Sequence, residues 1–512
     1  MTSTFTTDIR SFNASCFIKA LRVSLPALWE TNKTYTLGDI VFYGNGKYVV
    51  VESGTSGDMP PTHTIGIETD GLLNWIYIES IVVNNTYKNN LYFYIAQNTP
   101  WVNENSPPIP TVKDVDSYTL LDNIISLQKI NYDDIKLGAT RYNWVSGNVY
   151  EYYDSNKNIL DYSLPFYVLT DEHNIYKCLN NNNNSPSTSK PTTISTGILT
   201  LADGYSWKYL GSISSQDAVN FITNDFFPVD YKIYNDGSEQ WNVQQSAKVN
   251  SISTFIIQSQ VGVFTTPIAT VHGIGTGCVA YPIKAVNNTI REILIDTCGE
   301  NYSPETYVTI SEATAQGTGG LATAVLVGGA ISSIVIDDVG FNYTTAIVLI
   351  VGDGTGASAT CTIGLDTGIQ DITITSPGIN YTTAKVYIFA GTSGCVGKSI
   401  MSPIEGHGSN IVSELSASNI IIGNHIQTND YFLTGNTSTF RQTGIITDIV
   451  DIDGISATNQ YYVGFSHPDY ETTLTLNKIK RHIGHILYVS NIIPVTRTVE
   501  QEEYVKVSFS FS

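Results

Sequence analysis

Apolar and polar residues alternate in short runs along most of this chain, which is the pattern of β-strands. In residues 504–511 the side chains of Val505, Val507, Phe509 and Phe511 fall on one face, so we expect a half-buried strand. Ile, Val, Thr and Tyr are frequent, and Gly and Asn separate the runs. The pattern predicts a mainly β protein, with β-sandwich-like domains and few helices.

One segment, residues 117–129, has helical spacing instead. Asp114 and Asp116 precede it and can accept hydrogen bonds from the first amides of a helix. The apolar residues that recur at this spacing are Leu120, Leu121, Ile124, Ile125 and Leu127. The sequence therefore predicts a helix over about 117–129.

Two kinds of glycine-containing turn repeat between residues 266 and 400. The first, mostly Gly-Thr-Gly, begins at Gly275, Gly317, Gly354 and Gly391, at intervals of 42, 37 and 37 residues. The second, Gly-x-Asn-Tyr, lies between these turns and is flanked by alternating apolar runs. A unit of turn, strand, turn and strand must stack on its neighbours to bury its apolar face. We therefore expect an elongated β-repeat module over 266–400.

The glycines of these turns are not predicted to bind phosphate. A phosphate-binding loop places its glycines between a strand and a helix, and no helical pattern follows these turns. Glycine at a β-turn supplies positive φ without steric cost, which explains the spacing.

Residues 180–197 contain five consecutive Asn and almost nothing apolar to bury. We expect an exposed loop, with a disordered linker between domains as the alternative.

Composition limits the possible partners. The chain has 26 Lys and Arg against 46 Asp and Glu, giving a net charge of −20, and this excess of acid argues against nucleic acid. Charged residues make up 14%, below the roughly 25% of ordinary soluble domains. The 32 Tyr and the low charge suit a surface that is largely covered by protein partners.

The chain shows no sign of membrane insertion or of a disulfide scaffold. The first ten residues lack the pattern of a signal peptide, and no window has the roughly 18 consecutive apolar residues of a membrane span. Six Cys in 512 residues, with no CxxC pair, indicate neither a disulfide framework nor a zinc ribbon. We expect a protein made in a reducing cytoplasm.

No arrangement of residues indicates an enzyme, a metal site or a cofactor. His482 and His485 form the closest His pair, but residues three apart in a strand point to opposite faces. The chain has no GxSxG, HExxH or Walker sequence. We expect no catalysis, although the fold can still bring distant carboxylates together.

An aromatic cluster over about residues 25–80 resembles the small chitin- and cellulose-binding modules of bacterial glycosidases. The similarity lies in the pattern of Trp, Tyr, Gly-Asp-x-Val-x-Tyr, Tyr and Trp. It implies that Trp29, Tyr43, Tyr48 and Trp75 stack on sugar rings. The alternative is that these rings form the core of a small sheet used as a spacer, since a domain this small needs its aromatics inside.

From about residue 80 to the end, an ordered set of segments resembles the baseplate wedge protein of contractile-tailed bacteriophages, the gene product eight family. The set begins with Tyr92-Phe-Tyr-Ile-Ala-Gln-Asn-Thr-Pro100-Trp101-Val-Asn103-Glu104-x-Ser106-Pro107-Pro108-x-Pro110. It continues through residues 141–154, 166–181, 187–191, 202–209, 406–409, 441–445 and 484–497. The aromatic module and the long repeat array depart from the family pattern.

The resemblance implies a structural virion protein of the tail baseplate, made in the bacterial cytoplasm. It implies a homodimer in each wedge of a six-fold baseplate that joins neighbouring wedge proteins and rearranges on contraction. Within this family Trp101, Trp144 and Trp207 are expected to be packing anchors, and Gly204 and Gly408 turn formers. The alternative function is a tail-borne glycan-binding adhesin or polysaccharide depolymerase.

These observations divide the chain into five parts. Residues 1–24 are the N-terminal segment of the wedge core, and 25–80 are the carbohydrate-binding-like module. Residues 81–265 are the wedge core domain, 266–400 the repeat module, and 401–512 a C-terminal β part that completes the core.

Overall fold

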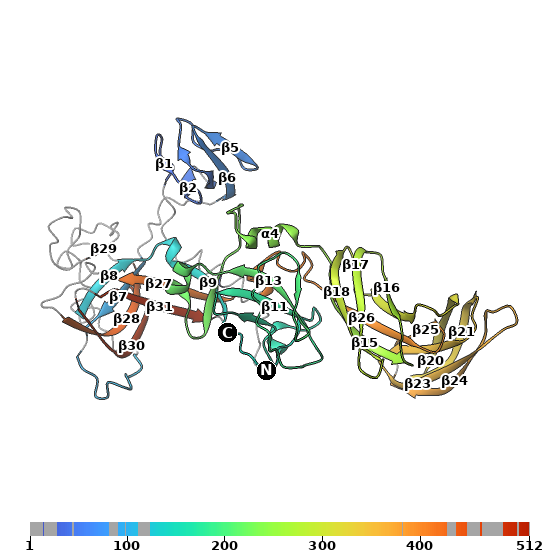
Figure 1. Ribbon diagram of the computed structural model, residues 1–512. Helices are drawn as coiled ribbons and strands as arrows, with labels where there is room; N and C mark the ends of the chain where they lie inside the picture. Colours follow the sequence, from blue (N-terminus) through green and yellow to red (C-terminus); the bar gives the residue numbers. More distant parts are fainter. Residues whose placement is uncertain are drawn as a thin grey trace. The chain divides into compact units, whose positions relative to one another are not determined.

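The computed structural model describes residues 14, 28–43, 46–80, 91–97, 99–110, 123–380, 382–426, 437–447, 461–462, 485–498 and 501–510. The protein is mainly β, which confirms the predicted fold class. It forms two compact units, each assembled from separate stretches of chain (Figure 1). The first comprises Met1–Arg141, Ser212–Trp241 and Ile411–Ser512, and the second comprises Tyr142–Gly211 and Asn242–Asn410. Residues 81–265, expected as one core domain, contribute to both.

A small antiparallel sheet occupies the N-terminal part of the first unit. Its strand order is β2 (Ile40–Tyr43), β3 (Gly46–Glu52), β6 (Leu73–Ser80) and β5 (Ile67–Asp70). The short strands β1 (Thr34–Tyr35) and β4 (Gly54–Thr55) pair beside it. These strands are the aromatic module of the sequence.

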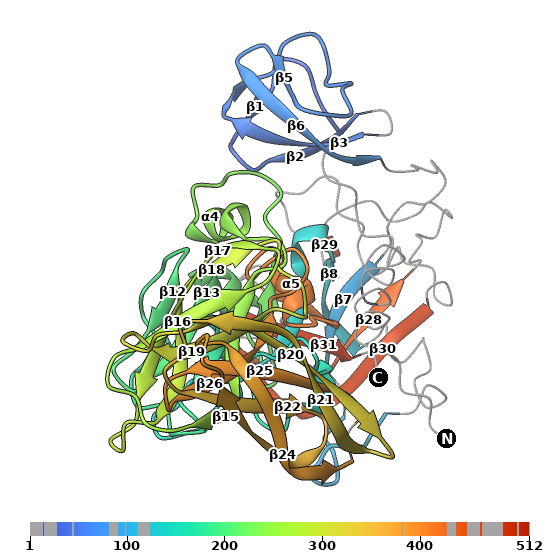
Figure 2. The ribbon, with the colours of Figure 1, turned by 90° about the vertical axis from the view of Figure 1, so that its right-hand side faces the viewer.

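Two further sheets form the main core of the first unit. One has the order β29 (Tyr461–Tyr462), β8 (Ile124–Lys129), β7 (Leu91–Ala96), β28 (Thr437–Thr447) and β30 (His485–Thr498). Figure 2 shows β7, β28 and β30 side by side. The other has the order β14 (Phe226–Val229), β9 (Ile135–Thr140), β27 (Asn419–Ile426) and β31 (Glu503–Ser510). Buried Ile and Phe side chains from both sheets share one core, as in a sandwich.

The helical segments whose full bounds lie in the described part of the chain are short. They are α3 (Ser215–Phe221), α4 (Glu239–Ser246), α5 (Ile411–Glu414) and the 3-10 turns η1 (Tyr132–Asp134) and η2 (Ile159–Asp161). Ser214 caps α3, because its side chain accepts a hydrogen bond from the amide of Asp217 at 3.0 Å.

The helix predicted over 117–129 is wrong for Ile124–Lys129, although Asn123 is helical. Ile124–Lys129 is the strand β8, and residues 117–122 lie outside the described residues. All side chains of β8 from Ile124 to Gln128 are buried, so the strand shows no alternation. A short apolar run buried on both faces cannot be told from a helix by its periodicity.

The C-terminal strand is confirmed as β31. Val505, Val507 and Phe509 pack against the shared core, as their alternation predicts. Phe511 lies outside the described residues.

The second unit contains a four-stranded and a six-stranded sheet. The first has the order β10 (Tyr167–Leu169), β11 (Asn174–Asn181), β13 (Tyr205–Ser212) and β12 (Ile198–Thr200). The second has the order β16 (Pro267–His272), β19 (Tyr307–Glu312), β26 (Gly394–Met401), β15 (Ile252–Val261), β18 (Ile290–Glu300) and β17 (Thr276–Lys284).

Residues 180–197 contain no further element after β11, but the loop is neither fully exposed nor disordered. Asn182, Asn183 and Asn184 have φ of 48°, 53° and 59°, the left-handed region that Asn tolerates better than most residues. The side chains of Asn181 and Ser187 are buried. Hydrogen bonds from these polar groups to the surrounding chain compensate for the missing apolar residues.

The glycine repeats form long hairpins. Three two-stranded sheets enclose one apolar core. They are β20 (Thr318–Val327) with β21 (Ala330–Phe341), β23 (Thr355–Ile363) with β24 (Ile369–Ile379), and β22 (Ala346–Gly352) with β25 (Ala384–Ala390). Each hairpin that begins at a Gly-Thr-Gly turn ends at a Gly-x-Asn-Tyr turn. Strands follow these turns, as the turn interpretation predicts.

A tyrosine clamps each of the first two repeat turns. The hydroxyl of Tyr302 accepts a hydrogen bond from the amide of Cys278 at 3.2 Å, and that of Tyr343 accepts one from Gly320 at 3.1 Å. Gly340, at φ 61°, leaves no room for a side chain, because a Cβ atom there would lie 2.5 Å from the amide nitrogen of Gly320. The turn therefore needs glycine for both conformation and space.

We expect Gly340→Ala to destabilise the β20–β21 hairpin by about 3 kcal/mol, since it combines a left-handed backbone with a steric clash. Gly328→Ala is a matched control, because Gly328 has φ 58° but nothing within 4 Å of its Cβ position. The control should cost only about 1 kcal/mol. Hydrogen exchange of β20 and β21 peptides measures both effects. An equal loss of protection in the two variants would contradict the steric requirement for glycine at position 340.

Candidate functional site

The structure separates the four aromatic residues that were expected to bind sugar. Trp75 and Tyr48 are 0% and 2% exposed and belong to the core of the small sheet, so neither can stack on a ligand. This part of the expectation is wrong, because four short strands have few other large apolar residues to bury.

A buried carboxylate fixes this core. One oxygen of Asp70 accepts hydrogen bonds from the indole nitrogens of Trp29 at 3.0 Å and of Trp75 at 3.4 Å. The other oxygen accepts the amide of Gly57 at 2.7 Å. Asp70 is 3% exposed, so these donors replace its lost hydration.

Trp29 and Tyr43 remain at the surface of the module. Their rings meet edge to face with centroids 5.8 Å apart, and Tyr43 is 41% exposed. Of the four residues expected to bind sugar, Trp29 and Tyr43 are therefore the two that are not buried.

The two roles predict opposite results for truncation. Trp75→Ala should destabilise the module by about 3–5 kcal/mol, as for other buried Trp residues, while Tyr43→Ala should cost about 1 kcal/mol or less. Hydrogen exchange of β3 and β6 peptides is the measurement. A similar loss in both variants would refute the assignment of Trp75 to the core.

The expected packing anchors occupy structural positions. Trp207 is 0% exposed, and its ring stacks on Tyr205 with centroids 5.5 Å apart. The indole nitrogen of Trp144 donates to the hydroxyl of Ser187 at 3.2 Å, and that of Trp101 donates to the carbonyl of Ile492 at 3.2 Å.

The two expected turn formers have positive φ. Gly204 has φ 83°, and a Cβ atom there would lie 2.8 Å from the side chain of Asn182. Gly408 has φ 84°, and a Cβ atom would lie 2.3 Å from Cγ1 of Val243. Both positions require glycine.

In the first unit, segments that carry the family resemblance bond directly to one another. The guanidinium of Arg441 forms a two-nitrogen ion pair with Glu104, with N–O distances of 3.0 to 3.2 Å. Gln442 donates to the side-chain oxygen of Asn491 at 2.9 Å, and the Asn491 amide donates to the carbonyl of Pro108 at 2.8 Å. Residues nearly 400 positions apart therefore complete one another's hydrogen bonding.

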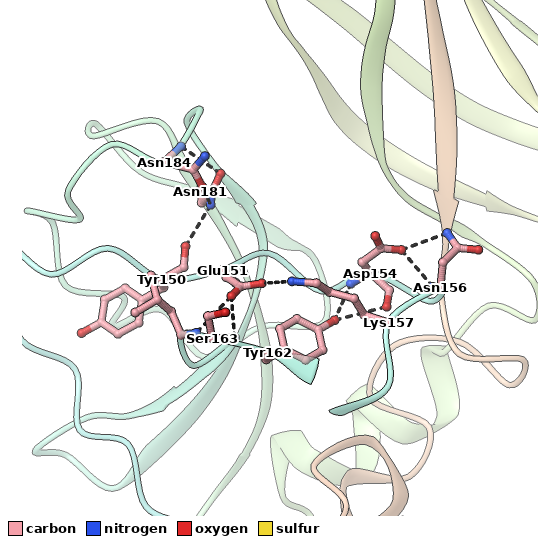
Figure 3. A network of polar contacts seen from close by, with 10 residues as sticks. Tyr150, Glu151, Asp154, Asn156, Lys157, Tyr162, Ser163, Asn181 and Asn184 are labelled. Carbon is pink, nitrogen blue, oxygen red and sulfur yellow. Dashed lines mark hydrogen bonds and ion pairs between the residues drawn. The ribbon is translucent and has the colours of Figure 1, made fainter. Parts of the chain in front are cut away.

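In the second unit, a polar network fixes the segments around residues 150–163 and 181–184 (Figure 3). Glu151 pairs with Lys157 and accepts the amide of Ser163 at 2.8 Å. The amide of Asp154 donates to the hydroxyl of Tyr162 at 2.7 Å. Burial acts to raise the pKa of Glu151, but Lys157 and the amide donors outweigh it and lower that pKa.

A group of buried Lys and His residues lies beside this network, and sequence analysis did not predict their burial. The ammonium of Lys177 lies 4.6 Å from the ring centre of Tyr153, and the ring of His407 meets Tyr153 edge to face at 5.2 Å. Nε2 of His407 lies 2.5 Å from the hydroxyl of Ser253. Burial, together with the charges of Lys177 and Lys208, lowers the pKa of His407 well below its usual range.

This shift predicts a pH-dependent stability. The unfolded chain takes up a proton on His407 below pH about 6.5 while the folded chain does not, so the stability from this residue is present above that pH and is lost on acidification. His407→Gln keeps a hydrogen-bonding group but removes the titration. The stability gap between wild type and variant should narrow as pH falls below about 6.5, by at most about 1.4 kcal/mol per pH unit.

Urea unfolding at a series of pH values measures this gap, followed by hydrogen exchange of β11, β13 and β15 peptides. A gap that stays constant from neutral to acidic pH would exclude a neutral, buried His407.

Two hollows lie in the second unit. A cavity of about 370 Å³ is lined by Lys208, Lys248, Asp296, Cys298 and His407, among others. A groove of about 560 Å³ runs beside β16, β19, β20 and β25. In the groove His272 stacks on Tyr307 with centroids 4.7 Å apart, and its Nε2 lies 2.8 Å from the hydroxyl of Thr309.

The described residues include no group of three or more His, Cys, Asp or Glu side chains placed to hold a metal ion. His482 lies outside these residues, and His485 begins β30 with a side chain that is not described. In the described part of the chain, no helix has the length and apolar character needed to cross a membrane.

No protein-family profile matches the chain, and a search of curated proteins found no match.

Proposed function

We propose that this protein is a structural virion protein, a baseplate wedge subunit of a contractile phage tail that forms a homodimer and joins neighbouring wedge proteins. The proposal rests on the ordered set of segments that resemble the gene product eight family. One observation carries it beyond resemblance: residues of these segments, far apart in sequence, contact one another in the folded units.

The first group of these segments meets in the five-stranded sheet. β28 pairs with β7 on one side and with β30 on the other, and Gln442 on β28 bonds to Asn491 on β30. Glu104, in the segment that follows β7, forms an ion pair with Arg441 on β28. A chance set of short motifs has no reason to occupy neighbouring strands and to satisfy one another's polar groups. The contacts therefore support treating the motifs as parts of one fold.

A second group meets in the four-stranded sheet of the second unit. Tyr150, Tyr176, Tyr205 and Trp207 share one buried cluster, and Gly408 leaves room for Val243 of the same cluster. These residues act by packing, so the motifs that define the resemblance support structural roles rather than chemistry.

The surface favours assembly. Charged residues are few and partly exposed apolar side chains are frequent, so a partner can cover this surface at a low cost of desolvation. In the repeat module the hairpin of β20 and β21 carries Leu321, Val325, Val335, Val339 and Phe341, each at least 40% exposed. Only the family resemblance supports the proposed rearrangement on contraction.

The dimer gives a direct test. Mass photometry and light scattering of the purified full chain should give about twice the monomer mass of 56.0 kDa. Antibodies to the chain should also label the distal end of tails in phage particles purified from the host. A clean monomer at micromolar concentration, with unlabelled tails, would refute the proposal.

A second candidate, a tail-borne glycan-binding adhesin or depolymerase, is favoured by the pair of the exposed Tyr43 and the partly buried Trp29. It predicts retention of the chain on host envelope polysaccharide, lost in Tyr43→Ala, and release of reducing sugar if the chain is a depolymerase. The wedge proposal predicts neither retention nor release, so one preparation of protein distinguishes the two functions.

A further inference from the structure

Two of the cysteines face each other across a pair of strands. Cys278 on β17 lies directly opposite Cys298 on β18 in the antiparallel register. Both side chains are partly buried and pack against the core of the six-stranded sheet, so they point to the same face. Both are free thiols in the structure.

Residues that lie directly opposite each other in an antiparallel ladder have, in general, the backbone spacing that a disulfide needs. The amide of Cys278 donates to the hydroxyl of Tyr302, as in a cross-strand pair that is not joined by ladder hydrogen bonds. The Cα atoms of such a pair lie about 4.5 Å apart, within the roughly 4.4–6.8 Å range of disulfides. Gly277 and Gly299, at φ 79° and 64°, flank the two cysteines and let the strands approach.

Comparison of the repeats shows that the fold does not require cysteine at these positions. The corresponding cross-strand pair is Gly320 with Val339 in the second hairpin and Ala357 with Pro377 in the third. The clamp from Gly320 to Tyr343 matches that from Cys278 to Tyr302. Two thiols therefore oppose each other in one repeat where the others carry unreactive residues.

A small molecule can reach this pair. Cys298 lines the 370 Å³ cavity together with Gly277 and Lys208. Burial raises the pKa of Cys298, while the ammonium of Lys208 acts in the opposite direction. Burial and the neighbouring Cys298 raise the pKa of Cys278 to about 12. Cys298, which lines the cavity, is therefore the thiol that meets an oxidant.

We propose that Cys278 and Cys298 are a redox modification site, which a low-molecular-weight disulfide such as oxidised glutathione converts to a reversible cross-strand disulfide. The Cys298 thiolate attacks one sulfur of glutathione disulfide, forming a mixed disulfide and releasing one glutathione thiolate. The Cys278 thiolate then attacks Sγ of Cys298 and releases the second. Two protein thiols are oxidised and one glutathione disulfide is reduced to two glutathione molecules.

The disulfide would join β17 to β18 beside the Gly-Thr-Gly turn. It would also reduce the conformational freedom of the unfolded chain. The chemistry depends only on these two residues and the cavity, so it stands apart from the proposed baseplate function. A chain made in a reducing cytoplasm would carry thiols and acquire the bond after release into an oxidising medium.

The test uses the full-length chain, purified in reductant and then incubated with oxidised glutathione. Peptide mapping should recover the Cys278 peptide joined to the Cys298 peptide as the main linked species. The intact mass should fall by two hydrogens, and the melting transition of the second unit should rise by a few degrees. Dithiothreitol should reverse all three changes.

Two single variants and one matched control complete the design. Cys278→Ser and Cys298→Ser should each abolish the linked peptide, whereas Cys361→Ser, which alters a partly buried cysteine on β23, should leave it unchanged. Cys278→Ser should also retain a stable mixed disulfide between Cys298 and glutathione, identified by mass.

Three results would overturn the proposal. The first is two free thiols after prolonged oxidation of the wild type. The second is a linked peptide that joins either residue to a different cysteine. The third is wild-type protein that stops at the mixed disulfide, which would show that the two sulfur atoms cannot meet. The mass and labelling tests of the baseplate function remain separate from these outcomes.

Discussion

The first unit depends on the burial of one apolar face shared by two sheets whose strands come from distant parts of the chain. β9 is central to this arrangement, because it pairs with β14 on one side and β27 on the other. The chain leaves the unit after β9 and returns before each of these partners. Insertions at these points add only the slowly growing entropy of loop closure, so a whole second unit can be accommodated. Arg141 ends the first stretch of this unit, and its amide donates to the carbonyl of Asp225, in the second stretch, at 2.7 Å.

The repeats of the second unit show how one turn geometry tolerates different chemistry. Gly and Asn supply positive φ in these turns, and in the first two repeats a tyrosine hydroxyl accepts the amide of the opposite strand. With the backbone held in this way, the cross-strand pair beside the turn is free to vary. The pair is two cysteines in the first repeat, Gly and Val in the second, and Ala and Pro in the third. Only the two cysteines can form a covalent bond with each other.

The sequence identified many residues of the candidate site, but it did not show which of their side chains are buried. The roles of Trp207, Gly204 and Gly408 follow from the family pattern, and the structure puts them at buried or positive-φ positions. Trp75 and Tyr48 have the same residue types as a sugar-binding face, yet they are buried. Composition cannot tell an exposed ring from a core ring, because both positions select large aromatic residues. Lys177 and His407 lie in segments that carry the family resemblance, but nothing in their local sequence reports that a folded core covers them.

The sequence by itself determined the features that depend on local backbone geometry. These are the period-two alternation of β31 and the glycine and asparagine turns that start and end the repeat hairpins, which act through φ and side-chain direction within a few residues. Only the tertiary structure decided what depends on neighbours. Ile124–Lys129 is a strand that pairs with β7, and its side chains from Ile124 to Gln128 are buried, which removes the alternation that would have identified it. Cys278 and Cys298 meet because hairpin register sets which residues oppose each other, and spacing along the chain carries no such information.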